Sequence, residues 1–223
     1  MYQLSVGAAY AYTRKCMDEL FSIETEGMVG ITDDLNLRKQ VEDCIVEAVV
    51  KTHKNAPSDL LEGVMGAYDI SYDLTAEENL GEGEEGVLTI TMKENTLRIV
   101  SIKAYDSDVV VCNFIPEDSA EGRKQLNKYV RGVSDDPRVV IAKVGHADYQ
   151  PILRYYTTTE KPSGRAITLT FIPYPEIVES IVEISPRLEY AVLNEIVAMI
   201  LDNMNMHDKA TLYRNKSAEH MAV

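Results

Sequence analysis

The 223-residue sequence has no tryptophan, only three phenylalanines and only three cysteines. Cys16, Cys44 and Cys112 are widely separated and odd in number, which is typical neither of a disulfide framework nor of a metal-ligand motif. Cys16 and Cys44 fall beside apolar positions of expected helices, so we predict that both are buried free thiols. The sequence also lacks a long uncharged apolar run and a basic start followed by an apolar stretch, so we expect no membrane association and no secretion signal.

Basic residues are scarce. The 22 Lys and Arg residues face 36 Asp and Glu residues, which gives a formal net charge of -14 at pH 7. The phosphates of a nucleic acid repel such a chain at long range, which argues against a dedicated DNA or RNA binder. A surface past which DNA moves without binding is still compatible with this charge. The hydrophobic content of 45% and charged content of 26% are those of an ordinary globular chain, so we expect a compact protein inside a cell or a particle assembled there.

Residues 1–64 form the first of three zones and are expected to be helical. Apolar side chains recur at steps of three and four residues from Val6 to Phe21, which places them on one face of a helix. A second stripe of the same spacing runs from Leu37 to Val49, and this helix must end before Pro57.

Residues 65–184 change to the period of two that is typical of strands. Short runs rich in Val, Ile, Thr and Tyr alternate with Gly, Asp, Asn, Ser and Pro. Glu94 and Asn95 occupy the position of a tight hairpin turn between two of these runs. No helical pattern long enough for repeated crossovers lies between the runs, which favours an antiparallel β-sandwich or barrel-like domain. Residues 119–132 are expected to form either a short helix or a long arm.

Residues 185–223 return to a helical pattern. Ser185 is a suitable cap and Pro186 suits the first helical position. Residues 185–203 are apolar around nearly the whole helix, and we expect part of this surface to be shared with neighbouring copies of the chain. We also expect the C-terminal helices to pack with the N-terminal helices. The predicted fold is therefore α+β, an antiparallel β-sandwich or barrel-like domain flanked by N-terminal and C-terminal helical pairs.

Catalytic and ligand-binding motifs give little support to an enzyme. His146 is the one histidine in a loop of the β zone, and with Asp148 it could form a base and its orienting group or half of a metal site. An alternative function is therefore a β-scaffold enzyme that uses His146, Asp148 and Cys112. The sequence has no zinc-binding, EF-hand or nucleophile-elbow motif, and the glutamates of the stretch GEGEEG would repel a bound phosphate. We therefore predict no catalytic residue, no metal and no cofactor.

Tyrosine and arginine cluster near residue 150, in the combination that is enriched in protein interfaces. The methionines near residue 205 can fill a core or make an adaptable contact with a neighbouring subunit. An alternative for the tyrosines is a carbohydrate-binding or other ligand-binding β module. The candidate partner-interface residues are Tyr149, Arg154, Tyr155, Tyr156, Met204 and Met206.

The order of a helix pair, a β domain and a second helix pair resembles head-to-tail connector proteins of tailed bacteriophages. These are the adaptor or ring subunits below the portal of short-tailed phages, including the crAss-like group. In that family a strand ending in a Tyr–Pro phrase, here Tyr174 and Pro175, leads through a second strand to a helix that begins with proline, here Pro186. A final helix with small residues and a tyrosine follows, here with Ala210 and Tyr213.

The resemblance implies a structural virion subunit rather than an enzyme, assembled in the bacterial cytoplasm. It implies a homo-oligomeric ring of about twelve copies that joins the portal protein to other tail or ring proteins. The ring would line a channel through which DNA passes without specific binding, and an acidic wall suits that role. Residues 76–86 and 117–136 are expected to reach partners above or below the ring.

Overall fold

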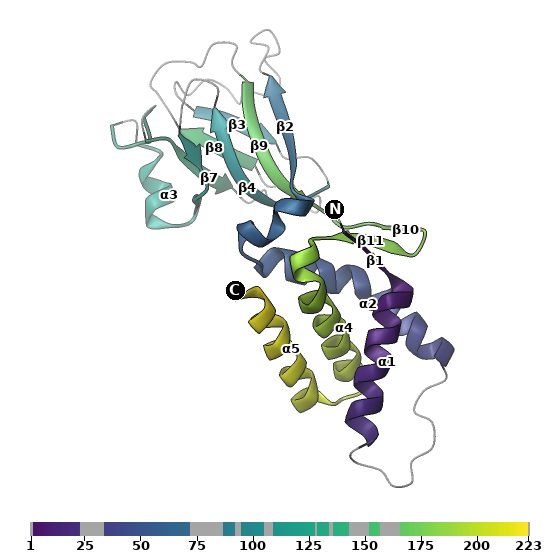
Figure 1. Ribbon diagram of the computed structural model, residues 1–223. Coiled ribbons are helices and arrows are strands. Elements are labelled where there is room, and N and C mark those ends of the chain that lie inside the picture. Colours follow the sequence, from purple (N-terminus) through teal and green to yellow (C-terminus); the bar gives the residue numbers. More distant parts are fainter. Residues whose placement is uncertain are drawn as a thin grey trace. The chain divides into compact units, whose positions relative to one another are not determined.

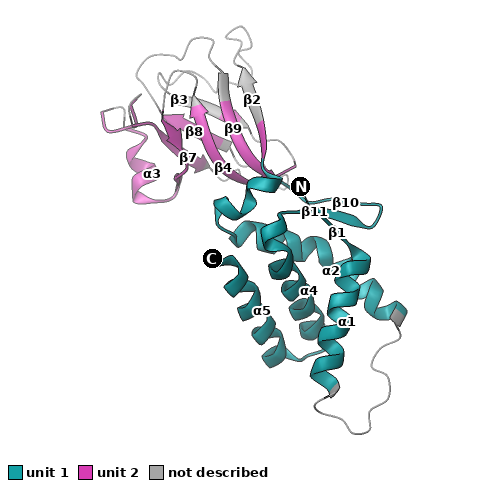
Figure 2. Ribbon diagram, viewed as in Figure 1, with its two compact units in different colours: residues 1–65, 173–223 teal, residues 66–172 magenta. Residues whose placement is uncertain are grey.

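The chain folds into two compact units in the computed structural model, which describes residues 2–22, 34–71, 87–91, 95–104, 109–127, 129–133, 136–142, 152–156 and 166–222. Residues 1–65 and 173–223 form unit 1, and residues 66–172 form unit 2 (Figure 2). The expected α+β class is confirmed, because helices dominate unit 1 and strands dominate unit 2. The β zone was expected to extend to residue 184, whereas residues 173–184 belong to the helical unit.

Unit 1 is built around helix α4 (Glu189–Asn203), which contacts α1 (Val6–Ser22), α2 (Asp34–Asn55) and α5 (His207–Met221) (Figure 1). Two 3-10 turns, η1 (Ser58–Val64) and η2 (Pro186–Leu188), precede strand β2 and helix α4. Ser185 does not cap its own helix. Its buried hydroxyl donates a hydrogen bond to the carbonyl oxygen of Leu60 and so joins η2 to η1.

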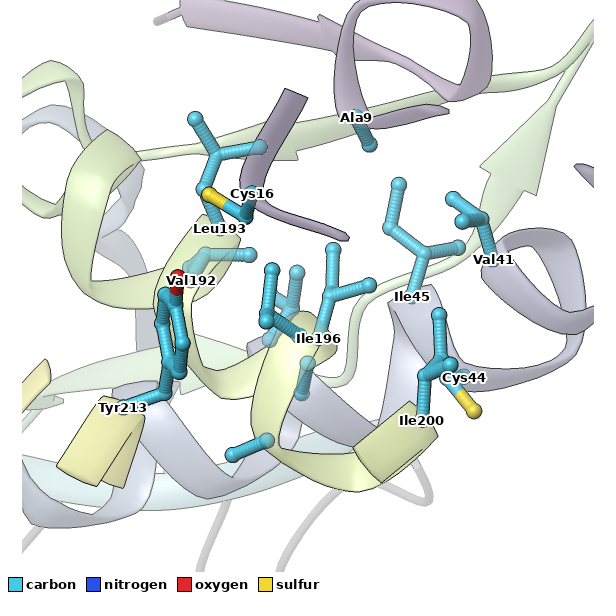
Figure 3. Packing of buried hydrophobic residues seen from close by; sticks show 14 of the residues in the cluster. Ala9, Cys16, Val41, Cys44, Ile45, Val192, Leu193, Ile196, Ile200 and Tyr213 are labelled. Carbon is cyan, nitrogen blue, oxygen red and sulfur yellow. The ribbon is translucent and has the colours of Figure 1, made fainter. Parts of the chain in front are cut away.

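The apolar surface of α4 is covered by its own chain. Residues 191–198 are all buried, as are Ile200 and Leu201. Figure 3 shows Ile196 and Ile200 of α4 near Ile45 of α2, in a cluster that also takes side chains from α1 and α5. The expectation that this helix shares its apolar surface with neighbouring copies is therefore wrong. A helix that is apolar all round is explained by a central position among three other helices.

A small sheet completes unit 1 and consists of β1 (Tyr2–Ser5), β11 (Ile181–Ile184) and β10 (Ile177–Val178), in that order. All neighbours pair antiparallel. Since successive side chains of a strand point to opposite faces, Val182 and Ile184 enter the core while Ile181 and Glu183 lie on the other face. This pairing explains why residues 173–184 belong to the helical unit.

Glu179 and Ser180 form the two-residue turn between β10 and β11. Their φ angles of 52° and 63° lie in the left-handed region that favours glycine or asparagine, as in a type I′ hairpin turn. The carbonyl oxygen of Ser180 also accepts a hydrogen bond of 2.9 Å from the Val6 amide at the start of α1. A non-glycine residue in this conformation costs about 1 kcal/mol.

Replacing Ser180 with glycine is expected to raise the free energy of unfolding of unit 1 by about 0.5 kcal/mol. The gain is smaller than the conformational cost because glycine also makes the unfolded chain more flexible. Urea unfolding followed by circular dichroism at the helical band checks this change. The matched control is Glu183→Gly in the middle of β11, which is expected to lower stability, and a loss of stability in both variants would contradict the prediction.

The described strands of unit 2 form two four-stranded sheets. One has the order β2 (Gly66–Ser71), β9 (Ala166–Pro173), β4 (Thr96–Ala104) and β5 (Val110–Val111). The other has the order β3 (Val87–Thr91), β8 (Ile152–Tyr156), β7 (Arg138–Ala142) and β6 (Phe114–Pro116), in which β6 and β7 are parallel. Both sheets contribute to one core, as in a sandwich, with Ile90, Val139, Leu153 and Tyr155 from the second sheet and Ile102, Val111 and Leu169 from the first.

The prediction of a hairpin turn at Glu94 and Asn95 is wrong. The two strands that flank this pair, β3 and β4, belong to different sheets, and β3 pairs antiparallel with β8. Strands β3 and β4 therefore lie in different layers of the sandwich. Alternation of apolar and polar residues identifies both strands correctly, but it does not identify their partners.

Residues 117–137 connect β6 to β7, and the short helix α3 (Ala120–Lys124) lies near the start of this connection. Ser119 caps this helix by accepting a hydrogen bond of 2.9 Å from the Gly122 amide. The loop that follows returns to its start, because the Gly132 amide donates a hydrogen bond of 2.9 Å to Oε1 of the buried Gln125. The expected alternatives for residues 119–132 were a short helix or an arm, and the structure contains a five-residue helix followed by a tied loop.

Two glycines fix the backbone of this loop against the sheet. A Cβ atom at Gly122 would lie 2.3 Å from the carbonyl oxygen of Pro116. A Cβ atom at Gly132 would lie 2.6 Å from both the Arg138 amide nitrogen and the Tyr156 carbonyl oxygen. A real Cβ atom does not come this close to backbone atoms, so only glycine fits at these two positions. The loop backbone therefore packs directly against β6, β7 and β8 there.

Candidate interaction surfaces

The tyrosines predicted to form an interface are inside unit 2. Tyr155 and Tyr156 of β8 have exposed fractions of 0% and 1%. Tyr155 belongs to the core between the sheets, and the guanidinium of Arg131 lies 5.8 Å from the centre of the Tyr156 ring. Neither ring offers surface to a partner, and neither can contribute to a tyrosine platform for a sugar. Tyr149 lies outside the described residues.

Arg154 is the one described member of that cluster with a half-exposed side chain. Its Nη1 atom lies 2.5 Å from Oε1 of Glu117, which follows β6. The pair therefore joins β8 to the start of the loop that carries α3. Because both side chains are more than a third exposed, an ion pair of this kind contributes at most about 1 kcal/mol.

Met204 and Met206 lie in the connection between α4 and α5. Both side chains are partly buried and pack against the core of unit 1. Asn205 between them has a φ angle of 58°, which ends α4 and turns the chain back into α5. The two methionines therefore fill the end of the helical core, and each leaves part of its surface accessible.

Candidate catalytic residues are not brought together in the described part of the chain. His146 and Asp148 lie outside the described residues, and Cys112 is exposed between β5 and β6. Cys16 and Cys44 are buried free thiols, as predicted, and burial is the main reason that the pKa of Cys44 is raised. Within the described ranges, no group of three or more His, Cys, Asp or Glu side chains is placed to hold a metal ion.

A buried carboxylate joins three helices of unit 1. Glu195 of α4 accepts a hydrogen bond from Nζ of Lys51 on α2, and its Oε1 atom lies 3.7 Å from Nε of Arg214 on α5. Arg214 also pairs with Asp202, and Nδ1 of His207 lies 2.9 Å from Oδ1 of Asp202. Hydrogen bonds from His207 and Arg214 hold the pKa of Asp202 below its usual value, so the ionised carboxylate contributes stability that is lost as pH falls through that lowered pKa.

Replacing Glu195 with glutamine is expected to lower the free energy of unfolding of unit 1 by about 1 to 2 kcal/mol. The amide keeps the shape of the side chain but removes the charge that Lys51 and Arg214 share. The loss is limited because both cations are partly exposed and regain water. Urea unfolding measures the change, with exposed Glu219→Gln on α5 as the control, and equal effects of the two substitutions would contradict the prediction.

A surface hollow of about 380 Å³ lies beside β6 on unit 2. Its walls are mainly apolar and come from Phe114, Pro116 and Ile141, and Glu117 and Asp118 also line it. The carboxylate of Glu117 is already paired with Arg154. The hollow is thus an apolar recess at the base of the loop that carries α3.

The loop after β6 exposes a basic apolar segment, which we define as residues 122–133. It contains Arg123, Lys124, Lys128 and Arg131 and no acidic residue, although the whole chain is strongly acidic. Lys128 lies outside the described residues. Large apolar side chains of this segment have exposed fractions between 55% and 84%, namely Leu126, Tyr129, Val130 and Val133.

The hairpin of β10 and β11 lies in an acidic apolar segment, which we define as residues 173–185. It contains Glu176, Glu179 and Glu183, all exposed, and no Lys or Arg. Tyr174 and Val178 in the same segment are 49% and 64% exposed. A count of charge in short windows of the sequence could have identified both segments, since each has charges of only one sign.

No model of a known protein family matches this chain, and no curated protein sequence matches it. Among the described helices, none combines the length and the apolar character that crossing a membrane requires. The candidate interaction surfaces are therefore identified from the geometry and charge of this chain alone.

Proposed function

We propose that this chain is a structural subunit of the head-to-tail connector of a tailed bacteriophage. In this role several copies form a ring that joins the portal to the tail and lines the channel for DNA. The observation that carries the proposal is the organisation of the chain, in which helices from both ends build one unit and the β unit is inserted between them. This organisation agrees with the layout of the connector proteins that the sequence resembles.

The lateral contacts of such a ring need surfaces other than α4. Because α4 is buried within unit 1, its apolar character no longer supports contact between copies. The exposed apolar side chains of the basic apolar segment and of the acidic apolar segment support it instead. Apolar side chains gathered at a surface and bordered by charge are typical of protein interfaces.

The acidic composition supports passage of DNA through a channel. A net charge of -14 makes electrostatic attachment to phosphates unfavourable, so DNA would pass without being retained. We expect no binding of a short DNA duplex at physiological salt, measured by fluorescence anisotropy. Tight binding of the duplex would contradict this part of the proposal.

Assembly with the portal protein of the same phage tests the function directly. The two proteins are mixed and examined by native mass spectrometry and electron microscopy. The expected product is a closed ring of about twelve copies attached to the portal. The proposal fails if the chain stays monomeric with the portal and is absent from purified virions.

A further inference from the structure

We propose that the basic apolar segment of one copy binds the acidic apolar segment of the next copy. The inference deepens the proposed function, because it names the two faces through which neighbouring subunits of the ring would meet. Residues 122–133 of unit 2 would form one face, and residues 173–185 of unit 1 would form the other.

The basic apolar segment exposes its apolar side chains on a fixed backbone. Gly122 and Gly132 seat the loop on the sheet, and the Gln125 side chain closes it with a buried hydrogen bond to the Gly132 amide. The amides of Val130 and Arg131 both donate to the carbonyl oxygen of Asn127, at 3.0 and 3.1 Å. A loop held in this way loses little conformational entropy when it binds, which favours association.

The apolar area of this segment is large for a surface loop. Leu126, Tyr129, Val130 and Val133 lie within eight consecutive residues, and Tyr129 is 84% exposed. Their separate exposed areas add up to on the order of 400 Å² of mainly apolar surface. Exposed apolar groups that are close in sequence and fixed in a rigid loop favour a protein over a nucleic acid as the partner.

The acidic apolar segment presents a matching face. Val178 lies opposite Ile181 in the β10–β11 ladder, on the face of the sheet that points away from the core. Glu183 shares that face, and Glu179 lies in the turn next to Val178. This face therefore combines apolar side chains with carboxylates, as the other segment combines them with Arg123 and Lys124.

Charge complementarity identifies a second copy of the chain as the partner. Outside the basic apolar segment, the chain has 18 basic and 36 acidic residues, so the four basic residues of this segment favour other copies as partners, and the exposed Glu121 and Asp136 mark its two borders. Among the described residues, the hairpin segment combines three exposed carboxylates with the exposed side chains of Tyr174 and Val178 and has no Lys or Arg. Because the two faces differ, each contact leaves one face of each kind free, and the association continues until it closes into a ring or extends as a filament.

Disulfide cross-linking between two differently tagged copies tests the contact. One copy carries Tyr129→Cys and the other carries Val178→Cys, both in a Cys112→Ser background that removes the exposed thiol. We expect the mixed dimer to exceed either dimer of identical copies at least tenfold, both with and without the portal protein. The matched control replaces Val178→Cys with Leu35→Cys, which is 75% exposed on α2 and lies outside both segments.

Charge reversal tests the specificity of the contact. The variant with Arg123→Glu and Lys124→Glu is expected to reduce the mixed dimer at least tenfold, and Glu176→Lys with Glu179→Lys is expected to do the same. Combining the two reversed copies is expected to restore at least half of the original yield. All four positions are exposed, so circular dichroism should show that the variants remain folded.

Three results would overturn the inference. The first is a yield of mixed dimer no higher than that of the Leu35→Cys control. The second comes from an additional variant that carries both Tyr129→Cys and Val178→Cys, if its disulfide forms only within one chain and never between chains. The third is binding of a short DNA duplex that Arg123→Glu and Lys124→Glu abolish while the cross-link persists unchanged, because the segment would then bind nucleic acid. Rings that form without the cross-link would support the proposed function and reject this contact. Open filaments that are cross-linked but do not bind the portal would support this contact and reject the proposed function.

Discussion

Replacing Ile196 with alanine is expected to lower the free energy of unfolding of unit 1 by about 3 kcal/mol. Ile196 lies in the middle of α4 and is fully buried among side chains of the other helices (Figure 3). Truncation removes buried methyl groups and leaves a cavity that the surrounding helices fill only in part. Urea unfolding, followed by circular dichroism at the helical band, measures the loss.

The same experiment distinguishes a core inside one chain from a core shared between copies. If α4 is covered by its own chain, the loss is the same at low and high protein concentration. A surface shared between copies would instead give a loss that depends on concentration. Leu212→Ala is the control, because Leu212 is about half exposed on α5 and its truncation is expected to change stability by less than about 0.5 kcal/mol. A concentration-dependent effect at Ile196 would contradict the structure of unit 1.

The free energy of unfolding of unit 1 is expected to fall between pH 7 and pH 4, and replacing His53 with leucine is expected to make this fall smaller by about 3 kcal/mol. His53 is buried near the end of α2, and neither ring nitrogen has a hydrogen-bond partner among the described residues. Burial lowers the pKa of His53 from 6.5 to about 4. The folded state therefore keeps the imidazole neutral at pH values where the unfolded chain binds a proton.

The sign of the pH effect follows from this difference in proton binding. Above pH 6.5 both states carry a neutral ring, and His53 has no effect on the pH dependence. Between pH 6.5 and about 4 the unfolded state binds more protons, so stability falls as the pH falls. The measurement compares unfolding free energies at pH 7 and pH 4 for the parent chain and for His53→Leu. Exposed His220→Gln is the control, and the same pH dependence in the parent chain and His53→Leu would contradict the prediction.

The helices of unit 1 could be predicted closely from the sequence. The expected stripe from Leu37 to Val49 lies in α2, and the helix ends at Asn55, two residues before Pro57. Local signals of this kind decide where a helix begins and ends. Local signals do not show which side chains cover a helix. The prediction that other copies cover α4 is wrong because a hydrophobic pattern indicates how much of a helix is buried and not which chain buries it.

The strands of unit 2 were identified, but their pairing and the burial of β8 were not. Tyr155 and Tyr156 are consecutive, so they point to opposite faces of the strand, and a strand at a surface would expose one of them. Both are buried because the sandwich core covers Tyr155, while Arg131 lies over Tyr156 and Gly132 approaches its backbone. This second cover comes from a loop more than twenty positions earlier in the sequence, which no local pattern reveals.

The discontinuous makeup of unit 1 affects the order in which a newly made chain can fold. Synthesis proceeds from the N-terminus, so α1 and α2 leave the ribosome long before α4 exists, and the whole of the inserted β unit is translated in between. During that interval the apolar faces of the first two helices lack the helix that later buries them. A nascent chain that stops before residue 203 would expose these faces to chaperones and proteases, which would remove incomplete chains.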